Sequence, residues 1–207
     1  MRENKEKNIK WHDARVSKQD RWLRNSHKSA LIWITGLSAS GKSSIAVELE
    51  RRLFDCQVNT FVLDGDNVRH GLNKDLGFGP EDRKENLRRV GEVAKLLVEA
   101  GILTIAAFIS PYASDRDGIR SLFREGEFIE VYLKCDLSVC EARDPKGFYK
   151  QARIGKIKEF TGVSAPYEVP MQSEIILETD RLSIRQSVDA LFSYLREHKI
   201  VLSEEGC

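Results

Sequence analysis

The sequence predicts a three-layer α/β domain, with a mainly parallel five-stranded sheet and helices on both of its faces. Two observations predict it: five short runs are almost wholly apolar, and amphipathic helical segments alternate with them. Strands that are buried on both faces form continuous apolar runs, and alternation with helices is typical of parallel sheets. The predicted strands span residues 30–35, 59–63, 102–109, 128–133 and 174–177. The predicted helices span residues 43–54, 81–100 and 184–198.

Composition limits the class of protein. The chain has 207 residues, of which 41% are hydrophobic, so it is long enough for one domain with a real core. Its 33 Lys and Arg against 32 Asp and Glu give no reason to expect binding to nucleic acid or to a membrane surface. The first residues lack the apolar stretch of a signal peptide, and no run reaches the roughly 20 apolar residues of a membrane span. The four cysteines form no C-x-x-C pair, so we expect reduced thiols and a cytoplasmic protein.

Residues 1–29 form a polar N-terminal arm ahead of the main domain, which we place at residues 30–207. The arm carries Trp11, His12 and Trp22, three rings that are unusual in a freely solvated segment. We therefore expect the arm to dock on the domain or on another subunit, with a loosely ordered tail as the alternative.

The basic stretch at residues 143–160 holds six Lys or Arg against two acids and follows the fourth predicted strand. Most such charge runs are solvated helix faces. Ligands of parallel sheets, however, bind at the carboxyl ends of the strands, where this stretch begins. The position favours a basic lid, at about residues 143–165, that closes over phosphates.

A phosphate-binding P-loop follows the first predicted strand and opens the first predicted helix. Its eight residues fit G-x-x-x-x-G-K-[ST] in full: Gly36, Leu37, Ser38, Ala39, Ser40, Gly41, Lys42 and Ser43. The glycines allow successive backbone N–H groups to converge on one anion, and the helix dipole adds positive potential there. We expect Lys42 to reach the β- and γ-phosphates of ATP and Ser43 to bind Mg²⁺. The fold class is thereby narrowed to that of the P-loop kinases.

Two acids follow the second predicted strand, at Asp64 and Asp66. An apolar strand that ends in Asp beside a P-loop is typical of the acid that holds Mg²⁺ directly or through water. We therefore assign Asp64 to the metal. Asp66, two residues on, is a candidate base for the acceptor hydroxyl.

Base-reading motifs of GTPases are absent, since Asn73-Lys74-Asp75 has its acid one place too early for N-K-x-D. One compact βα set with a basic lid favours a small-molecule kinase. Two alternatives stay open from the residues alone: a kinase of another nucleotide or nucleoside, and a nucleotide-binding regulator without turnover. The intact P-loop lysine and the acids at 64 and 66 argue against the regulator.

Further segments are more specific than the fold. They read DGDNVRHGLNKDLGF at residues 64–78, EDRKENLRRVG at 81–91, FISPY at 108–112, CEARDPKGFYK at 140–150 and FTG at 160–162. This series resembles the adenylyl-sulfate kinase (APS kinase) family over nearly the whole chain, from Trp11 to the last helix.

The resemblance implies that the chain transfers the γ-phosphoryl group of ATP to the 3′-hydroxyl of adenylyl sulfate. The product would be 3′-phosphoadenylyl sulfate, the activated sulfate of sulfate assimilation. The resemblance also implies Mg²⁺ as the cofactor, a homodimer, and functional coupling to an ATP sulfurylase.

The resemblance further assigns residues to the two nucleotides. Arg69 and Arg83 would hold the phosphosulfate of the acceptor, Phe78 and Phe160 would stack on its adenine, and Arg143 would pack on the adenine of ATP. Lys146 and Arg153 would be lid cations. The implied acceptor-binding set is Asp66, Arg69, Phe78, Arg83, Asn86, Ile109, Ser110, Lys146 and Phe160.

Lys42, Asp66 and Ser110 are the candidate catalytic residues. Families of this type are often described with a phosphoserine intermediate at the position of Ser110. A serine hydroxyl without an adjacent base is, however, a weak nucleophile, and the nearby sequence offers no histidine. We therefore predict direct in-line transfer, with Ser110 as a positioning group.

The chain departs from the usual family pattern at four places. Gly79 precedes Pro80 where Ser is usual, and glycine is a passable N-cap before a proline. Ala39 replaces a frequent glycine of the P-loop. Ala113-Ser114 stands where a basic residue is common, and Ser164-Ala165 stands where an acid and a serine are common. These differences bear on substrate affinity and not on the class of reaction.

Overall fold

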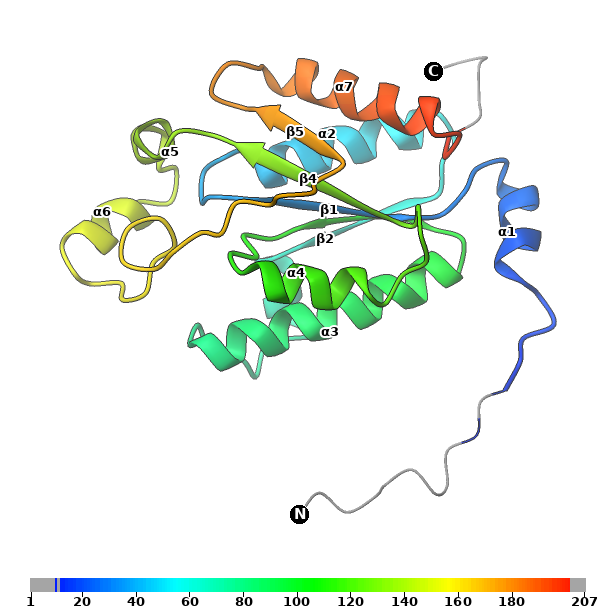
Figure 1. Ribbon diagram of the computed structural model, residues 1–207, viewed down its shortest axis with the longest axis horizontal. Coiled ribbons are helices and arrows are strands. Elements are labelled where there is room, and N and C mark those ends of the chain that lie inside the picture. The colour runs from blue at the N-terminus through cyan, green and yellow to red at the C-terminus, as the bar shows by residue number, and fades with distance from the viewer. Residues whose placement is uncertain (1–9, 11, 202–207) are drawn as a thin grey trace.

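The computed structural model describes residue 10 and residues 12–201 as a three-layer α/β fold (Figure 1). All five strands run parallel, in the order β2-β3-β1-β4-β5. Their bounds are β1 Leu31–Gly36, β2 Thr60–Asp64, β3 Leu103–Ala107, β4 Phe128–Lys134 and β5 Ile175–Glu178. Each lies within a few residues of the predicted strand, and the mainly parallel sheet that the sequence predicts is wholly parallel.

Helices cover both faces of the sheet. α2 (Lys42–Asp55) and α7 (Ile184–Glu197) pack together on one face, and α3 (Pro80–Glu99) and α4 (Ala113–Arg120) lie on the other (Figure 1). β1 supplies both cores, because Ile32 and Ile34 face α2 and α7 whereas Leu31 and Trp33 face α3. This period of two explains why the strand is apolar at every position from Leu31 to Ile34.

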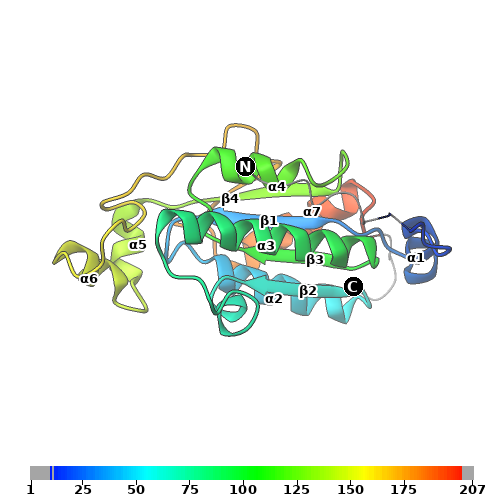
Figure 2. The same cartoon turned by 90° about the horizontal axis from the view of Figure 1, so that it is seen from below.

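Two further groups of elements lie at opposite ends of the strands (Figure 2). At the carboxyl ends lie α5 (Leu137–Arg143) and α6 (Phe148–Arg153), which share a small apolar cluster with the P-loop residues Leu37 and Ala39. At the amino end lies α1 (Lys18–Asn25). A short 3-10 helix, η2 (Asn67–His70), follows β2. The sequence did not predict α1, η2, α4, α5 or α6.

The N-terminal arm contacts the domain through α1. The buried Lys18 ammonium lies 3.0 Å from a Glu99 carboxylate oxygen and 2.6 Å from one of Glu127. Asn25 donates to the carbonyl of Gly101 at 3.1 Å. Trp11 lies outside the described residues.

The thiols differ from the sequence expectation at one position. Cys135 and Cys140 are buried and free, as expected, and Cys207 lies outside the described residues. The expectation is wrong for Cys56, which is disulfide-bonded. No helix within residues 12–201 is long and apolar enough to cross a bilayer.

His27 joins the arm to the sheet as a buried neutral imidazole. Its Nδ1 lies 2.8 Å from the carbonyl oxygen of Lys28, which only accepts, so Nδ1 carries the hydrogen. Nε2 then accepts the backbone N–H of Asn59 at 3.0 Å. Burial lowers the pKa of His27 below its ordinary value of 6.5. Protonation would turn Nε2 into a donor that faces another donor.

We expect the free energy of unfolding to fall as pH drops below about 6.5, because the unfolded chain then binds a proton that folded His27 excludes. Urea unfolding between pH 5 and 8 measures this slope. His27→Gln should be less stable at pH 8 but should lose less stability toward pH 5. The exposed His198 provides the control, since His198→Gln makes the same substitution outside the buried site. An unchanged slope in His27→Gln would contradict the assignment.

Candidate active site

The P-loop connects β1 to α2 at the carboxyl edge of the sheet. Gly36 and Gly41 have φ angles of 153° and 101°, and Ala39 has φ 59°. A Cβ at Gly36 would lie 2.9 Å from both Leu133 O and Ser40 Oγ, so this position requires glycine. Ala39 adopts a left-handed conformation with a side chain, which costs about 1–2 kcal/mol. Contacts with the surrounding residues must therefore offset this strain.

Lys42 lies folded back on the loop. Its Nζ donates to the carbonyl oxygens of Gly36 at 3.0 Å and Leu37 at 2.6 Å. Burial lowers its pKa to about 8, and nearby Asp64 opposes that shift. A polyphosphate in the loop would supply the negative charge that favours the ammonium form, so the lysine is poised for an anion.

Two acids adjoin the P-loop as the sequence predicts. Ser43 Oγ donates to Asp64 Oδ2 at 2.7 Å, which brings the hydroxyl and the carboxylate to one point. The other oxygen of Asp64 accepts the backbone N–H of Asp66 at 2.9 Å. Asp66 in turn forms an ion pair with Lys146 from the segment between α5 and α6. A continuous line of polar groups therefore runs from the P-loop to the basic segment.

Arg69, Phe78 and Arg83 form a second cluster beside η2 and the start of α3. The Arg69 guanidinium lies 4.4 Å above the Phe78 ring and donates to Gly77 O at 2.8 Å. Arg83 Nε donates to the carbonyl of Phe78 at 2.8 Å. Burial, and then the nearby Arg83, lower the pKa of Arg69. Two neighbouring guanidiniums and a ring that is 69% exposed suit an aromatic anion.

Asn86 lies one turn after Arg83 and is buried. Its Oδ1 accepts from Asn73 Nδ2 at 2.9 Å, a contact that the sequence did not predict. Gly79 is the N-cap of α3 and Pro80 its first residue, as predicted.

Ser110 follows β3 and is only 2% exposed. Its Oγ accepts the indole N–H of Trp33 at 3.0 Å and donates to Thr35 Oγ1 at 2.9 Å. The hydroxyl is thus fully engaged by two buried partners. No acid or histidine is a hydrogen-bond partner of Ser110 Oγ among the residues described.

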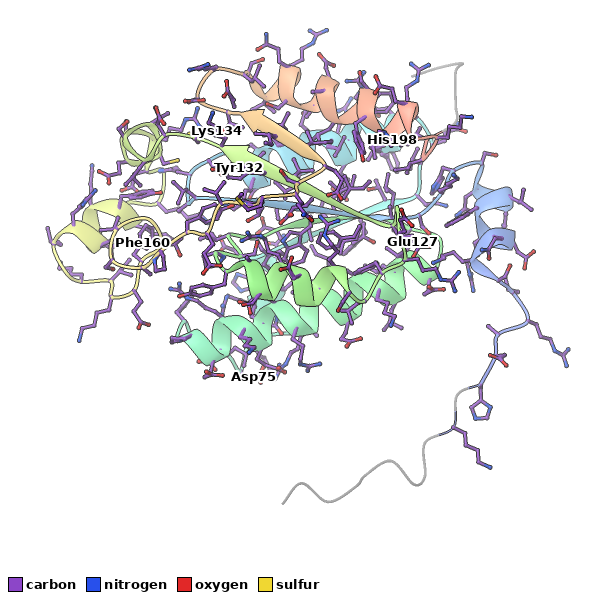
Figure 3. All side chains as sticks on the ribbon, in the orientation of Figure 1. Asp75, Glu127, Tyr132, Lys134, Phe160 and His198 are labelled. Atoms are coloured by element: carbon purple, nitrogen blue, oxygen red, sulfur yellow. The ribbon has the colours of Figure 1, made fainter. Side chains whose placement is uncertain are left out.

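The basic stretch at residues 143–160 also contributes side chains to the site. Arg143 donates to the carbonyl of Thr179 at 2.6 Å and lies 3.5 Å from that of Ala39. Phe160, visible beside α6 in Figure 3, packs edge-on to Tyr149, with ring centroids 5.0 Å apart. Arg153 forms an ion pair with Glu141 of α5 and does not line the cleft.

One cleft of about 1640 Å³ joins these clusters. Its lining includes almost all of the predicted site residues: Ser38, Ala39, Ser40, Gly41, Lys42, Ser43, Asp64, Asp66, Arg69, Phe78, Arg83, Asn86, Ile109, Ser110, Arg143, Lys146 and Phe160. Gly36 and Leu37 do not line it. The lining also includes Lys156 and Lys158, which were not predicted as site residues although both stand in the basic stretch. Five further lining residues carry no sequence signal: Thr179, Leu182, Ser183, Ile184 and Ser187.

Known proteins similar to this chain identify its family. The sequence profile described as adenylylsulphate kinase matches residues 28–178. The adenylyl-sulfate kinase of Staphylococcus haemolyticus is 59% identical over 94% of this chain and 98% of its own length. A probable adenylyl-sulfate kinase of Bacillus subtilis is 53% identical over 94% and 98%.

Solved structures agree with this assignment. The APS kinase of Mycobacterium tuberculosis in complex with AMPPNP and APS has a TM-score of 0.78 and 44% identity, covering 82% of this chain and 99% of its own. A sugar kinase from Janibacter at 19% identity and a TM-score of 0.59 shares the fold alone. The chain therefore belongs to the adenylyl-sulfate kinase family.

Proposed function

We propose that this chain transfers the γ-phosphoryl group of ATP to the 3′-hydroxyl of adenylyl sulfate. The observation that carries the proposal is the single cleft that holds a P-loop at one end and the Arg69–Phe78–Arg83 cluster at the other, with Asp66 in the same lining. Such a cleft accommodates two nucleotides, and the Mycobacterium relative was solved with AMPPNP and APS. The acceptor oxygen attacks the γ-phosphorus, the bond to the bridging oxygen breaks, and ADP leaves.

The ATP end of the cleft would be built around the P-loop. Its backbone N–H groups and Lys42 would hold the phosphates and the charge that spreads over the moving group. Arg143 would pack on the adenine, because its contacts with Ala39 and Thr179 place it between the P-loop and the β5–α7 connection. Leu182 and Ile184 from that connection supply apolar surface in the same region.

The residues present fit a magnesium ion. Ser43 Oγ and Asp64 Oδ2 are 2.7 Å apart, and hydroxyl and carboxylate oxygens are the ligands that Mg²⁺ takes beside substrate phosphates. These two side chains would hold it. Bound there, the ion would neutralise phosphate charge during transfer.

The acceptor end would use the paired guanidiniums. Arg69 and Arg83 would bind the phosphosulfate, while Phe78 and Phe160 would stack on its adenine. Asn86 and the backbone at Ile109 and Ser110 would line the ribose side. Asp66 would take the proton from the attacking 3′-hydroxyl, and Lys146 would turn from Asp66 to the bound nucleotides as segment 143–165 closes as a lid.

Release of ADP across a panel of acceptors tests the proposal. We expect fast turnover with adenylyl sulfate and little with AMP, adenosine or gluconate. Preference for another nucleotide or nucleoside would favour the first alternative. Nucleotide binding without turnover of any acceptor would favour the regulatory alternative.

Arg83→Ala should weaken the binding of adenylyl sulfate by about 10- to 100-fold, the effect of losing one hydrogen-bonded charge. ATP binding, measured by calorimetry, should hardly change. Arg88 on the same helix is paired with Glu85 and does not line the cleft, so Arg88→Ala is the matched control. A loss of affinity mainly for ATP would contradict the proposed position of the acceptor.

Ser110→Ala should retain substantial turnover, because we assign the buried hydroxyl to positioning. Transfer from ATP with an isotopically chiral γ-phosphate should invert the configuration at phosphorus, as one displacement requires. Retention would need two displacements and would favour a phosphoserine. Complete loss in Ser110→Ala with acceptor binding intact would also count against direct transfer.

The family resemblance implies the assembly of the protein, and the cysteine pattern implies its location. We infer a homodimer, which light scattering tests, and coupling to an ATP sulfurylase, which co-elution and coupled assays test. A cytoplasmic location is likewise an expectation, which cell fractionation tests.

A further inference from the structure

We propose that Tyr167 and Arg116 are positioning residues, which fix the Ser110 loop against the strand that enters the P-loop. The inference rests on the proposed function, because it concerns where the acceptor lies relative to ATP. Neither residue is in the lining of the cleft. They act through Thr35 and Ser110.

The Ser110 loop needs external support. Ser110 has φ 38°, a left-handed conformation that a residue with a side chain adopts at a cost of about 1–3 kcal/mol. Such a conformation persists only where the surrounding contacts over-determine it. The loop also lines the cleft at Ile109, Ser110 and Pro111, so its backbone faces the expected acceptor.

Tyr167 supports the loop through Thr35, the residue before Gly36. Thr35 Oγ1 donates to the carbonyl of Ile109 at 2.7 Å, which uses its single hydrogen. The same oxygen lies 2.9 Å from Ser110 Oγ and 2.9 Å from Tyr167 OH. Because Thr35 has no hydrogen left to give, the Tyr167 hydroxyl must be the donor. Tyr167, which follows the lid segment, is thus linked by hydrogen bonds through Thr35 to β1 and to the Ser110 loop.

Arg116 supports the same loop from α4. Its buried guanidinium donates to Ser110 O at 2.8 Å and to Glu168 O at 2.8 Å. Its Nε lies 2.8 Å from a Glu130 carboxylate oxygen on β4, so its charge is compensated. The Arg116 side chain therefore connects the Ser110 loop, the backbone at Glu168 and the sheet.

The segment that follows the lid, at Tyr167 and Glu168, is hydrogen-bonded to the Ser110 loop. The backbone N–H of Glu168 donates to Pro111 O at 2.8 Å, and the Glu168 carboxylate accepts the N–H of Ala113 at 2.7 Å. The Tyr167 ring stacks on Tyr132, which Figure 3 labels on β4, with centroids 5.9 Å apart. These contacts connect the segment that follows the lid to the Ser110 loop and, through Thr35, to the strand that enters the P-loop. Their loss should misalign the two nucleotides without removing a group that touches either.

The test begins with Tyr167→Phe, which deletes only the hydroxyl. We expect kcat to fall about fivefold to tenfold, as for one lost hydrogen bond, with the KM for ATP within twofold of wild type. Tyr132→Phe is the matched control, because the ring is the neighbour of Tyr167 and its hydroxyl forms no hydrogen bond with the described residues. It should keep the wild-type kcat. Equal losses in both variants, or no loss in Tyr167→Phe, would overturn the proposal.

A double-variant cycle separates positioning from simple packing. If Tyr167 acts through Thr35, adding Tyr167→Phe to Thr35→Val should lower kcat no further. Losses that multiply would contradict the proposal. Should Thr35→Val fail to fold, the comparison of the two Phe variants decides.

The NMR signal of the Trp33 indole N–H, which donates to Ser110, supplies a readout without turnover. It should shift in Tyr167→Phe and stay in Tyr132→Phe. If wild type fails to phosphorylate adenylyl sulfate although this signal responds, the proposed function fails while the network stands. Turnover by wild type with an unmoved signal and an unchanged kcat in Tyr167→Phe defeats the positioning role alone.

Discussion

Lys42→Ala is expected to abolish turnover while leaving the fold intact. We propose that its ammonium holds the γ-phosphoryl group as it moves, and removing one such group from a preorganised site typically costs at least about 10²–10³ in kcat. Lys42 donates to two P-loop carbonyls, and burial lowers its pKa to about 8. Burial already disfavours its charge, so alanine should change the melting temperature little.

Single-turnover and steady-state rates, with circular dichroism and thermal unfolding, measure these outcomes. Lys74→Ala is the control, because Lys74 is exposed and absent from the cleft lining. It should leave kcat unchanged. A near-normal kcat in Lys42→Ala would refute the assignment of the P-loop.

The sheet could be predicted from sequence because each strand carries its own signal. β1 is buried at all six positions, so its apolar run is continuous, and glycine ends it where the P-loop begins. α3 could be predicted equally well, since Gly79 and Pro80 mark its start and its apolar stripe recurs over 20 residues. Both elements are encoded by residues that lie next to one another in the chain.

The missed helices are short and depend on distant partners. α4 (Ala113–Arg120) has only Arg116 and Ile119 buried and contains Gly118, so it shows no apolar periodicity. α1 is held by ion pairs of Lys18 with residues far along the chain. Its capping box, Ser17 with Asp20, was the one local signal that could have revealed it.

The residues of the active site likewise fall into those that a local motif predicts and those that only the fold brings together. The P-loop and the acids at 64 and 66 form a local pattern that sequence reading found. By contrast, Thr35 and Tyr167 are 132 positions apart, and Arg143 and Thr179 are 36 apart. No motif connects such pairs, since only the fold brings their atoms within hydrogen-bond distance. Side chains that support the site from beneath are therefore harder to predict than those that touch a ligand.

Asp66→Asn should lower kcat by about 10²–10⁴, the usual contribution of a general base, while the affinities for both nucleotides change little. The substitution keeps the size of the side chain but removes the carboxylate that would accept the proton of the 3′-hydroxyl. Asp75, labelled in Figure 3, pairs with Arg89 and does not line the cleft, so Asp75→Asn makes the same change elsewhere. It should keep the wild-type kcat. Comparable losses of affinity with an unchanged kcat would make Asp66 a binding residue only.

The ion pair between Asp66 and Lys146 offers a competing explanation, because asparagine would also release the lysine. Both side chains are more than half exposed, at 64% and 55%, so the pair itself stabilises the fold by at most about 1 kcal/mol. Lys146→Met separates the two roles. If Asp66 is the base, this variant should mainly raise the KM for the nucleotides, and adding Asp66→Asn to it should still lower kcat by about 10²-fold or more. If Lys146→Met alone lowers kcat as far as Asp66→Asn does, with no further loss in the double variant, then Asp66 serves to hold Lys146.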